Sequence, residues 1–369
     1  MNYLVCSDSF KECMDASKAC SIIARGILKA DKTATIKQVP LADGGEGTEE
    51  VLIAAKGYQE KFINTIDLLG KKIRVKYGYK DNSVIIDCSK VIGLDLIKQS
   101  HRNPFKVNSL GLGLVIKELI NQGVSEFIIG LGGSATVDGG LGFLIGLGAK
   151  IFCNGQVVNL EIASILNIDR IDLTAVFKLT ENITFKVASD VDNYYLGEKG
   201  AVNVFAKQKG ATESQMPLLE ANLINIHKII KRDYDLDINV KKAGAAGGLG
   251  GALFLIGADL ISGIDMVIKE CNLEQLIIES DVVISGEGSV DEQTINGKTI
   301  SGVAKICQKY NTKLVVLCGQ LSDNIDNLYL MGVTAAFSII NKSSTLNENL
   351  KNAETNLENS AYNICRLIQ

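Results

Sequence analysis

The chain has 369 residues, and 38 Lys and Arg against 42 Asp and Glu give a net charge of −4 at pH 7. An apolar fraction of 46% and a charged fraction of 22% are ordinary for a folded globular protein and exclude a disordered or collagen-like chain. The charge balance argues against a nucleic-acid-binding protein, which usually carries a basic face.

The first sixty residues predict alternating strands and helices. Strands are expected at 3–6 and 35–39. Helices are expected at 16–30, where apolar residues recur every three or four positions, and at 43–56, which would end before Gly57. This order favours a parallel sheet covered by helices on both faces.

The middle of the chain has a different pattern. Segments 73–79 and 83–87 alternate at period two around a turn at 80–82, which predicts an antiparallel hairpin. Helices are then expected at 110–120 and 218–230, strands at 127–129 and 185–188, and a Gly-rich loop at 130–140. Near the C-terminus, strands at 281–285, 313–317 and 333–337 alternate with helices. The last helix begins at the capping box of Thr345 and Glu348.

We therefore expect an α/β fold of two unlike α/β domains. Residues 1–60 and 281–369 would form one domain, with a parallel Rossmann/flavodoxin-like sheet built from both termini, and residues 61–280 would form the inserted second domain. The N-terminus reaches Asp8 before any long apolar run develops, which is not typical of a signal peptide, so we expect a cytoplasmic protein. Nine Cys without a Cys-x-x-Cys pair favour reduced thiols.

Histidine chemistry has little support in this sequence. Only His101 and His227 are present, and no Gly-x-Ser-x-Gly elbow supplies a nucleophile for a Ser-His-Asp hydrolase. Acid–base chemistry is therefore expected from carboxylates or Lys.

Four Gly-rich clusters, at 43–48, 130–140, 244–251 and 286–291, are the main functional signal. Each can direct backbone N–H groups at an anion, and the alternative for each is a tight turn with close packing. Gly130-x-Gly132-x-x-Ala135 fits a relaxed dinucleotide fingerprint. The expected next strand end, at 151–155, carries no carboxylate, which disfavours nicotinamide binding. Gly297-Lys298-Thr299 is similar to the end of a P-loop, but Glu292 stands where the first Gly would be, and we reject a P-loop.

Asp190 and Asp192 follow the strand expected at 185–188. Two carboxylates at a strand's carboxyl end can hold Mg²⁺ with phosphate oxygens, and the alternative is a simple turn. Five cations lie near the loops, and each alone is typical of a solvated surface charge: Lys11, Arg102, Lys207, Lys209 and Lys298.

Taken in order, these loops resemble the glycerate kinase type 1 family over essentially the whole chain. The matching motifs are Asp8-Ser9-Phe10-Lys11, Pro40 to Thr48, Gly132 to Gly140, Asp190-Val191-Asp192-Asn193, Gln208-Lys209-Gly210-Ala211, Gly244 to Gly250, and Gly286-Glu287-Gly288 with Asp291 and Gly297-Lys298. The resemblance implies ATP-dependent phosphorylation of D-glycerate with Mg²⁺, in a cleft between two unlike α/β domains. Whether the chain forms a homodimer stays open.

On this resemblance, Lys11, Asp190 and Asp291 are the expected catalytic residues, and Asp190 and Asp192 the expected metal ligands. The expected substrate and phosphate ligands are Ser9, Asp43, Arg102, Gly132, Gly133, Ser134, Ala135, Thr136, Glu287 and Lys298. The sequence departs from the family pattern at Glu12 and Ser289. Two alternatives are a NAD-dependent oxidoreductase of a small hydroxy acid and a non-catalytic metabolite-binding regulator on the same fold.

Overall fold

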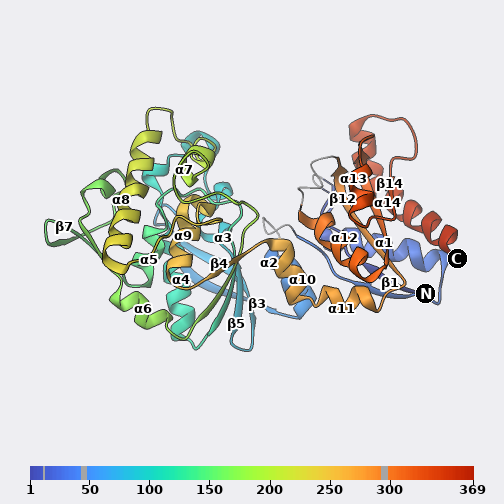
Figure 1. Cartoon of the computed structure of the whole chain (residues 1–369), viewed down its shortest axis with the longest axis horizontal. Helices are drawn as coiled ribbons and strands as arrows, with labels where there is room; N and C mark the ends of the chain where they lie inside the picture. Colours follow the sequence, from blue (N-terminus) through green and yellow to red (C-terminus); the bar gives the residue numbers. More distant parts are fainter. Residues whose placement is uncertain (11–12, 43–47, 292–297) are drawn as a thin grey trace. The chain divides into compact units, whose positions relative to one another are not determined.

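The computed structural model describes residues 1–10, 13–42, 48–291 and 298–369. The chain divides into two compact units. The first unit comprises Met1–Asp43, Glu50–Lys56 and Gly263–Gln369, and the second comprises Gly44–Glu49 and Gly57–Ser262. Both ends of the chain, blue and red in Figure 1, thus belong to the first unit. The domain boundaries predicted at 60 and 280 stay a prediction.

Strands and helices alternate in the first unit, as the sequence pattern at both ends predicts. Its elements are β1 (Asn2–Val5), α1 (Ala16–Ala30), β2 (Thr35–Gln38), α2 (Thr48–Lys56), α10 (Gly263–Glu270), α11 (Leu273–Ile278), β12 (Val282–Val290), α12 (Lys298–Tyr310), β13 (Lys313–Leu321), α13 (Asp326–Leu330), β14 (Ala335–Ser338) and α14 (Leu346–Ile368).

The sheet of the first unit has the strand order β14-β13-β12-β1-β2, and every neighbouring pair is parallel. The chain leaves β1 toward β2 on one side and leaves β12 toward β13 on the other, so the strand order reverses between β1 and β12. Ligands of open α/β sheets bind at such a switch point, outside the carboxyl ends of the strands.

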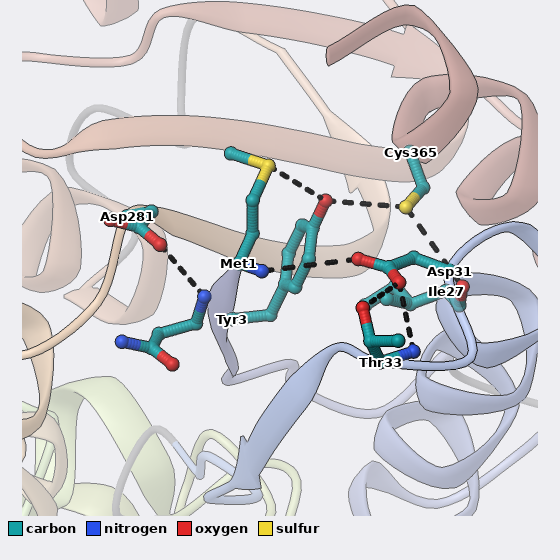
Figure 2. A network of polar contacts seen from close by, with 8 residues as sticks. Met1, Tyr3, Ile27, Asp31, Thr33, Asp281 and Cys365 are labelled. Atoms are coloured by element: carbon teal, nitrogen blue, oxygen red, sulfur yellow. Dashed lines mark hydrogen bonds and ion pairs between the residues drawn. The ribbon is translucent and has the colours of Figure 1, made fainter. Parts of the chain in front are cut away.

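Helix α14 covers the sheet beside α1 (Figure 1), with the capping box of Thr345 and Glu348 at its start. The two helices approach closely because Gly26 has no side chain: a Cβ there would lie 2.8 Å from that of Ala361. Near the end of α14, the Cys365 sulfur lies 3.2 Å from the Tyr3 hydroxyl of β1. Figure 2 shows this contact. The C-terminal helix is thereby fixed to the first strand.

The second unit is a mixed α/β body with three 3₁₀ turns preceding its Gly-rich loop. Its elements are β3 (Gln59–Ile66), β4 (Lys72–Lys80), β5 (Ser83–Asp87), α3 (Ser89–Ile92), η1 (Leu94–Leu96), η2 (Gln99–His101), η3 (Pro104–Lys106), α4 (Leu110–Asn121), β6 (Glu126–Gly130), α5 (Leu141–Leu147), β7 (Lys150–Cys153), β8 (Gln156–Val158), η4 (Ile162–Asn167), β9 (Arg170–Asp172), α6 (Thr174–Thr180), β10 (Thr184–Ala188), α7 (Ala201–Phe205), α8 (Met216–Tyr234), η5 (Ala245–Gly248), α9 (Leu249–Leu255) and β11 (Asp259–Ile261).

The main sheet of the second unit has the order β11-β10-β6-β5-β4-β3. β11, β10, β6 and β5 are parallel, whereas β4 pairs antiparallel with β5 and β3, which confirms the predicted hairpin. The buried residues of β5, β6 and β10 form the core with helices α4, α5 and α9. The α/β fold class with parallel sheets is as predicted. None of the described helices combines the length and apolar composition that a bilayer crossing requires.

Candidate functional site

The carboxyl ends of three parallel strands meet at one edge of the second unit's sheet. In the strand register, Asp87 at the end of β5 lies opposite Gly130 at the end of β6, and Gly130 lies opposite Ala188 at the end of β10. The loops that follow these strands therefore start side by side. The structure thus brings the predicted Gly-rich loop and the predicted Asp190 to the same edge.

Asp87 is a buried carboxylate that the sequence analysis missed. Its side chain lies against the end of β6, because a Cβ on Gly130 would be 2.2 Å from Asp87 Oδ1. The Asp87 backbone N–H donates to Glu49 Oε2 at 3.0 Å, and both acids are buried. Asp87 ends an apolar strand and Asp190 comes just after one, and this shared pattern could have identified Asp87.

The last residue of α3 and the first residue of η1 hold one loop in place, here called the 132–136 loop: Gly132, Gly133, Ser134, Ala135 and Thr136. Leu94 N–H donates to Gly133 O, and Ala135 N–H donates to Ile92 O, both at 2.8 Å. Gly132 is half-buried and Gly133 exposed, whereas the next three residues are buried. The two glycines are therefore the part of the loop that a ligand can reach.

Arg102 is fixed beside this loop. Its Nη2 donates to Leu94 O at 3.2 Å, and Leu94 in turn holds Gly133. Within the described ranges, the buried Nε of Arg102 has no hydrogen-bond acceptor. Gly210 packs on the Arg102 backbone, where a Cβ would lie 2.3 Å from Arg102 O. The predicted Arg102 thus lies beside the 132–136 loop, and its Nε–H is a donor that a ligand could use.

The two predicted metal ligands differ in their surroundings. Asp190 is half-buried directly after β10, whereas the Asp192 side chain is 62% exposed and its Oδ1 lies 3.1 Å from the ammonium of Lys242. Lys242 also donates to Ser189 O at 2.8 Å, so it ties Asp192 to the strand end. The sequence analysis did not single out Lys242, which lies about fifty residues further along the chain.

The chemistry of this pair fits Mg²⁺, which takes carboxylate oxygens together with phosphate oxygens and water. Among the described residues, no three Asp, Glu, His or Cys side chains gather as a metal cage. Mg²⁺ usually binds through one or two carboxylates and does not need such a cage.

Lys207 and Lys209 are two positions apart in the sequence but differ strongly in solvent exposure. The Lys207 side chain is 61% exposed and pairs with Glu213 at 2.9 Å, as expected of a surface charge. Lys209 is 3% exposed and donates to the 132–136 loop, so the interpretation of Lys209 as a solvated charge is wrong. Only its place in the family motif Gln208-Lys209-Gly210-Ala211 indicated a functional role for Lys209.

The Gly-rich cluster at 244–251 is a packing element. A Cβ on Gly247 would lie 1.9 Å from Thr136 O, and Cβ atoms on Gly248 and Gly251 would lie 2.8 and 2.5 Å from the Tyr195 ring. The Gly139 N–H donates to Gly247 O at 3.0 Å. These contacts support the close-packing alternative over anion binding for this cluster.

In the first unit, Ser9 and Glu287 lie at the switch point between β1 and β12. The Asp8 carboxylate accepts from Ser9 N–H at 2.6 Å and from the Thr299 hydroxyl at 3.0 Å, which joins β1 to the start of α12. Asp291, half-buried, follows β12. Lys11 and Asp43 lie outside the described residues, and so does the side chain of Lys298.

The fourth Gly-rich cluster does not form the tight turn that was the alternative to anion binding at this position. Strand β12 continues to Val290 and pairs with β13 as far as Leu321. Gly286 lies within the strand, where a Cβ would be 2.5 Å from Leu317 O. Most of this cluster therefore lies in a strand, and Gly286 allows that strand to lie close to β13.

A model of the glycerate kinase family matches residues 3–369. The chain belongs to the glycerate kinase family. It is 35% identical to the glycerate 2-kinase of Escherichia coli, over 99% of this chain and 97% of that protein. It is 36% identical to the glycerate kinase of Haemophilus influenzae, over 100% and 99%.

A solved structure gives the same result. The crystal structure of a putative glycerate kinase 2 from Salmonella typhimurium matches with a TM-score of 0.89 at 34% identity, over 100% of this chain and 98% of that one. The family fold therefore extends over both units of this chain.

The structure does not support our sequence argument against nicotinamide binding. We took the segment ending at Cys153 as the next strand of a dinucleotide fold. β7 instead pairs antiparallel with β8 and β9 in a separate sheet, and β10 is the next parallel neighbour of β6. The missing acid after Cys153 is thus no evidence against nicotinamide binding, and the full-length glycerate kinase match is what disfavours the oxidoreductase.

Proposed function

We propose that the chain is an ATP-dependent glycerate kinase, which transfers the γ-phosphoryl group of ATP to a hydroxyl of D-glycerate. The observation that carries this proposal is the family match from one end of the chain to the other. The order of the seven motifs supports placing it in the type 1 division. We further propose the 2-hydroxyl as acceptor, because one of the relatives is named a glycerate 2-kinase.

The second unit is suited to binding anionic groups. We propose that Gly132 and Gly133 bind phosphate or carboxylate oxygens through their backbone, with the Arg102 guanidinium supplying charge. Phosphoryl transfer requires mainly positioning and charge stabilisation from a protein, and this edge of the sheet offers both.

We propose that Asp190 and Asp192 hold Mg²⁺, with Lys242 keeping Asp192 at the strand end. Held by these two carboxylates, Mg²⁺ would supply positive charge that stabilises the transferred phosphoryl group. Lys11, Asp190 and Asp291 are assigned to catalysis. The glycerate hydroxyl loses its proton to a carboxylate as it attacks the γ-phosphorus, and ADP leaves. Ser9, Asp43, Glu287 and Lys298 are assigned to substrate or phosphate binding.

A coupled ADP-release assay tests this function. With ATP, Mg²⁺ and D-glycerate the protein should release ADP, and L-glycerate serves as the matched control for recognition of the acid. Chelating Mg²⁺ should abolish the signal. ADP release that is independent of glycerate would contradict the glycerate kinase proposal, and the absence of turnover despite ATP binding would favour the metabolite-binding regulator.

A further inference from the structure

Lys209 places a buried ammonium in contact with the 132–136 loop. It lies in the turn after α7, and its Nζ donates to Ser134 Oγ and to Thr136 O, both at 2.9 Å. An ammonium has three donors, and these contacts use two of them. The side chain is 3% exposed, so it does not serve a surface role.

The charge of this ammonium is not balanced by an ion pair. In the part of the chain that the structure describes, no carboxylate pairs with Lys209. Asp138 acts on it from nearby, but the Asp138 oxygens already accept from Ser109, Gly140 and Gly142. A buried charge is costly unless it has a partner. An anionic ligand would supply the missing negative charge.

The 132–136 loop that Lys209 contacts also carries hydrogen-bond donors. Among the described residues, the backbone N–H groups of Gly132 and Gly133 make no hydrogen bond to another backbone group. Gly133 has φ +66°, a conformation that turns successive N–H groups into one concave nest for anions. Ser134 Oγ accepts from Lys209, which leaves the hydroxyl proton to donate elsewhere.

We propose that Lys209 is a positioning residue for the kinase reaction: it fixes Ser134 and Thr136 and supplies the positive charge that draws an anionic oxygen group onto Gly132 and Gly133. The anion is either a phosphoryl group of ATP or the carboxylate of glycerate. The assignment of the anion to these substrates rests on the proposed function, whereas anion binding itself does not.

The charge of Lys209 depends on pH in the physiological range. Burial lowers the pKa of its ammonium to about 8, while the neighbouring Cys88 and Asp138 act in the opposite direction. Asp87 in turn acts on Cys88, whose own pKa is raised to about 12 by burial. Anion binding should therefore be strong below pH 8 and weaken as the pH rises through that value.

Calorimetric titration with sulfate and, separately, with D-glycerate tests this inference without any turnover. Neither probe changes its charge between pH 6.5 and 9.5, whereas the charged fraction of a lysine with a pKa of about 8 falls roughly thirtyfold. For the wild type, the Kd of at least one probe should rise about tenfold or more across this range. The probe that responds identifies the phosphoryl or the carboxylate source.

Three variants complete the design. Lys209→Met should weaken binding at pH 6.5 to the level that the wild type has at pH 9.5 and remove the pH dependence. Ser134→Ala, which keeps the charge, should weaken binding at both pH values but retain the dependence. Lys207→Met, the exposed neighbour, should match the wild type.

A pH dependence that persists in Lys209→Met, or one that is absent from the wild type for both probes, would overturn the inference. Failure of the kinase assay with intact Lys209-dependent anion binding would instead count against the proposed function alone. If the kinase is active, Lys209→Met should raise the KM of one substrate more than it lowers kcat.

Discussion

The Asp138 carboxylate accepts two hydrogen bonds from Ser109, one from its N–H at 2.8 Å and one from its hydroxyl at 2.7 Å. It also accepts from the N–H groups of Gly140 and Gly142, each at 3.1 Å, at the start of α5. Ser109 Oγ in turn accepts from Phe143 N–H at 2.8 Å. One fully buried acid thus joins the starts of α4 and α5 just after the 132–136 loop.

Asp138→Asn should therefore destabilise the protein strongly. An amide would turn an NH₂ group toward donors, and a buried donor left unsatisfied costs about 1–3 kcal/mol. We expect a loss of roughly 3 kcal/mol in the free energy of unfolding, measured by urea denaturation. Asp172→Asn is the control, since Asp172 is partly exposed and accepts from the N–H of its near neighbour Thr174, and this variant should change stability by less than about 0.5 kcal/mol. Equal losses in both variants would contradict this network.

Gly210→Ala should lower the free energy of unfolding by more than the strain of its backbone conformation alone. Gly210 has φ +94° and Gly197 has φ +93°, but a Cβ at 210 would lie 2.3 Å from Arg102 O, whereas a Cβ at 197 meets nothing within 4 Å. Gly197→Ala should therefore cost about 1 kcal/mol from conformational strain, and Gly210→Ala roughly 2–4 kcal/mol in thermal denaturation. Equal losses of stability in the two variants would show that the Arg102 backbone moves aside without a loss of stability.

Asp190→Asn tests the metal assignment. It keeps the shape of the side chain and removes its charge, so kcat should fall by roughly 10² or more while the melting temperature changes little. Asp192→Asn should have the smaller effect, because Asp192 is exposed and shared with Lys242. If Asp190→Asn retains turnover within about threefold of the wild type, the run after β10 is only a turn.

The lowered pKa of Lys209 should also appear in the stability of the protein without ligand. Between a folded pKa of about 8 and the ordinary value of 10.5, the unfolded chain binds more protons than the folded one, so stability rises with pH. The difference in unfolding free energy between the wild type and Lys209→Met should grow by roughly 2–3 kcal/mol from pH 7 to pH 10.5. Buried thiols lower the stability of both proteins as the pH rises, and comparing the wild type with Lys209→Met cancels this contribution. A difference that does not change with pH would show that the pKa of Lys209 is not lowered.

Local signals predicted much of the fold. The apolar spacing of α1 placed that helix at Ala16–Ala30, and the capping box of Thr345 and Glu348 marked the start of α14, because both depend on residues within one or two turns. Alternation at period two likewise located the β4–β5 hairpin. These features need no knowledge of tertiary contacts.

The misses depend on contacts between distant segments. Strand β12 runs past Gly286 because β13 pairs with it to Leu321, and β7 leaves the main sheet because β8 and β9 pair with it. Lys209 is buried by the 132–136 loop, some seventy residues earlier, and Lys242 meets Asp192 across fifty residues. Sequence order alone does not show such pairings, although the motifs that contain Asp190 and the 132–136 loop pointed to the right edge of the sheet.

The most direct test of the glycerate kinase assignment is the ³¹P NMR spectrum of the wild-type protein with MgATP and D-glycerate. The account predicts that the γ-phosphate signal of ATP is replaced by ADP and one phosphomonoester. Its phosphorus should couple to a single carbon-bound proton, as a phosphate on the 2-hydroxyl does. Coupling to two protons would place the phosphate on the 3-hydroxyl and correct the regiochemistry. A spectrum in which only inorganic phosphate appears, or in which ATP stays intact, would contradict the assignment itself.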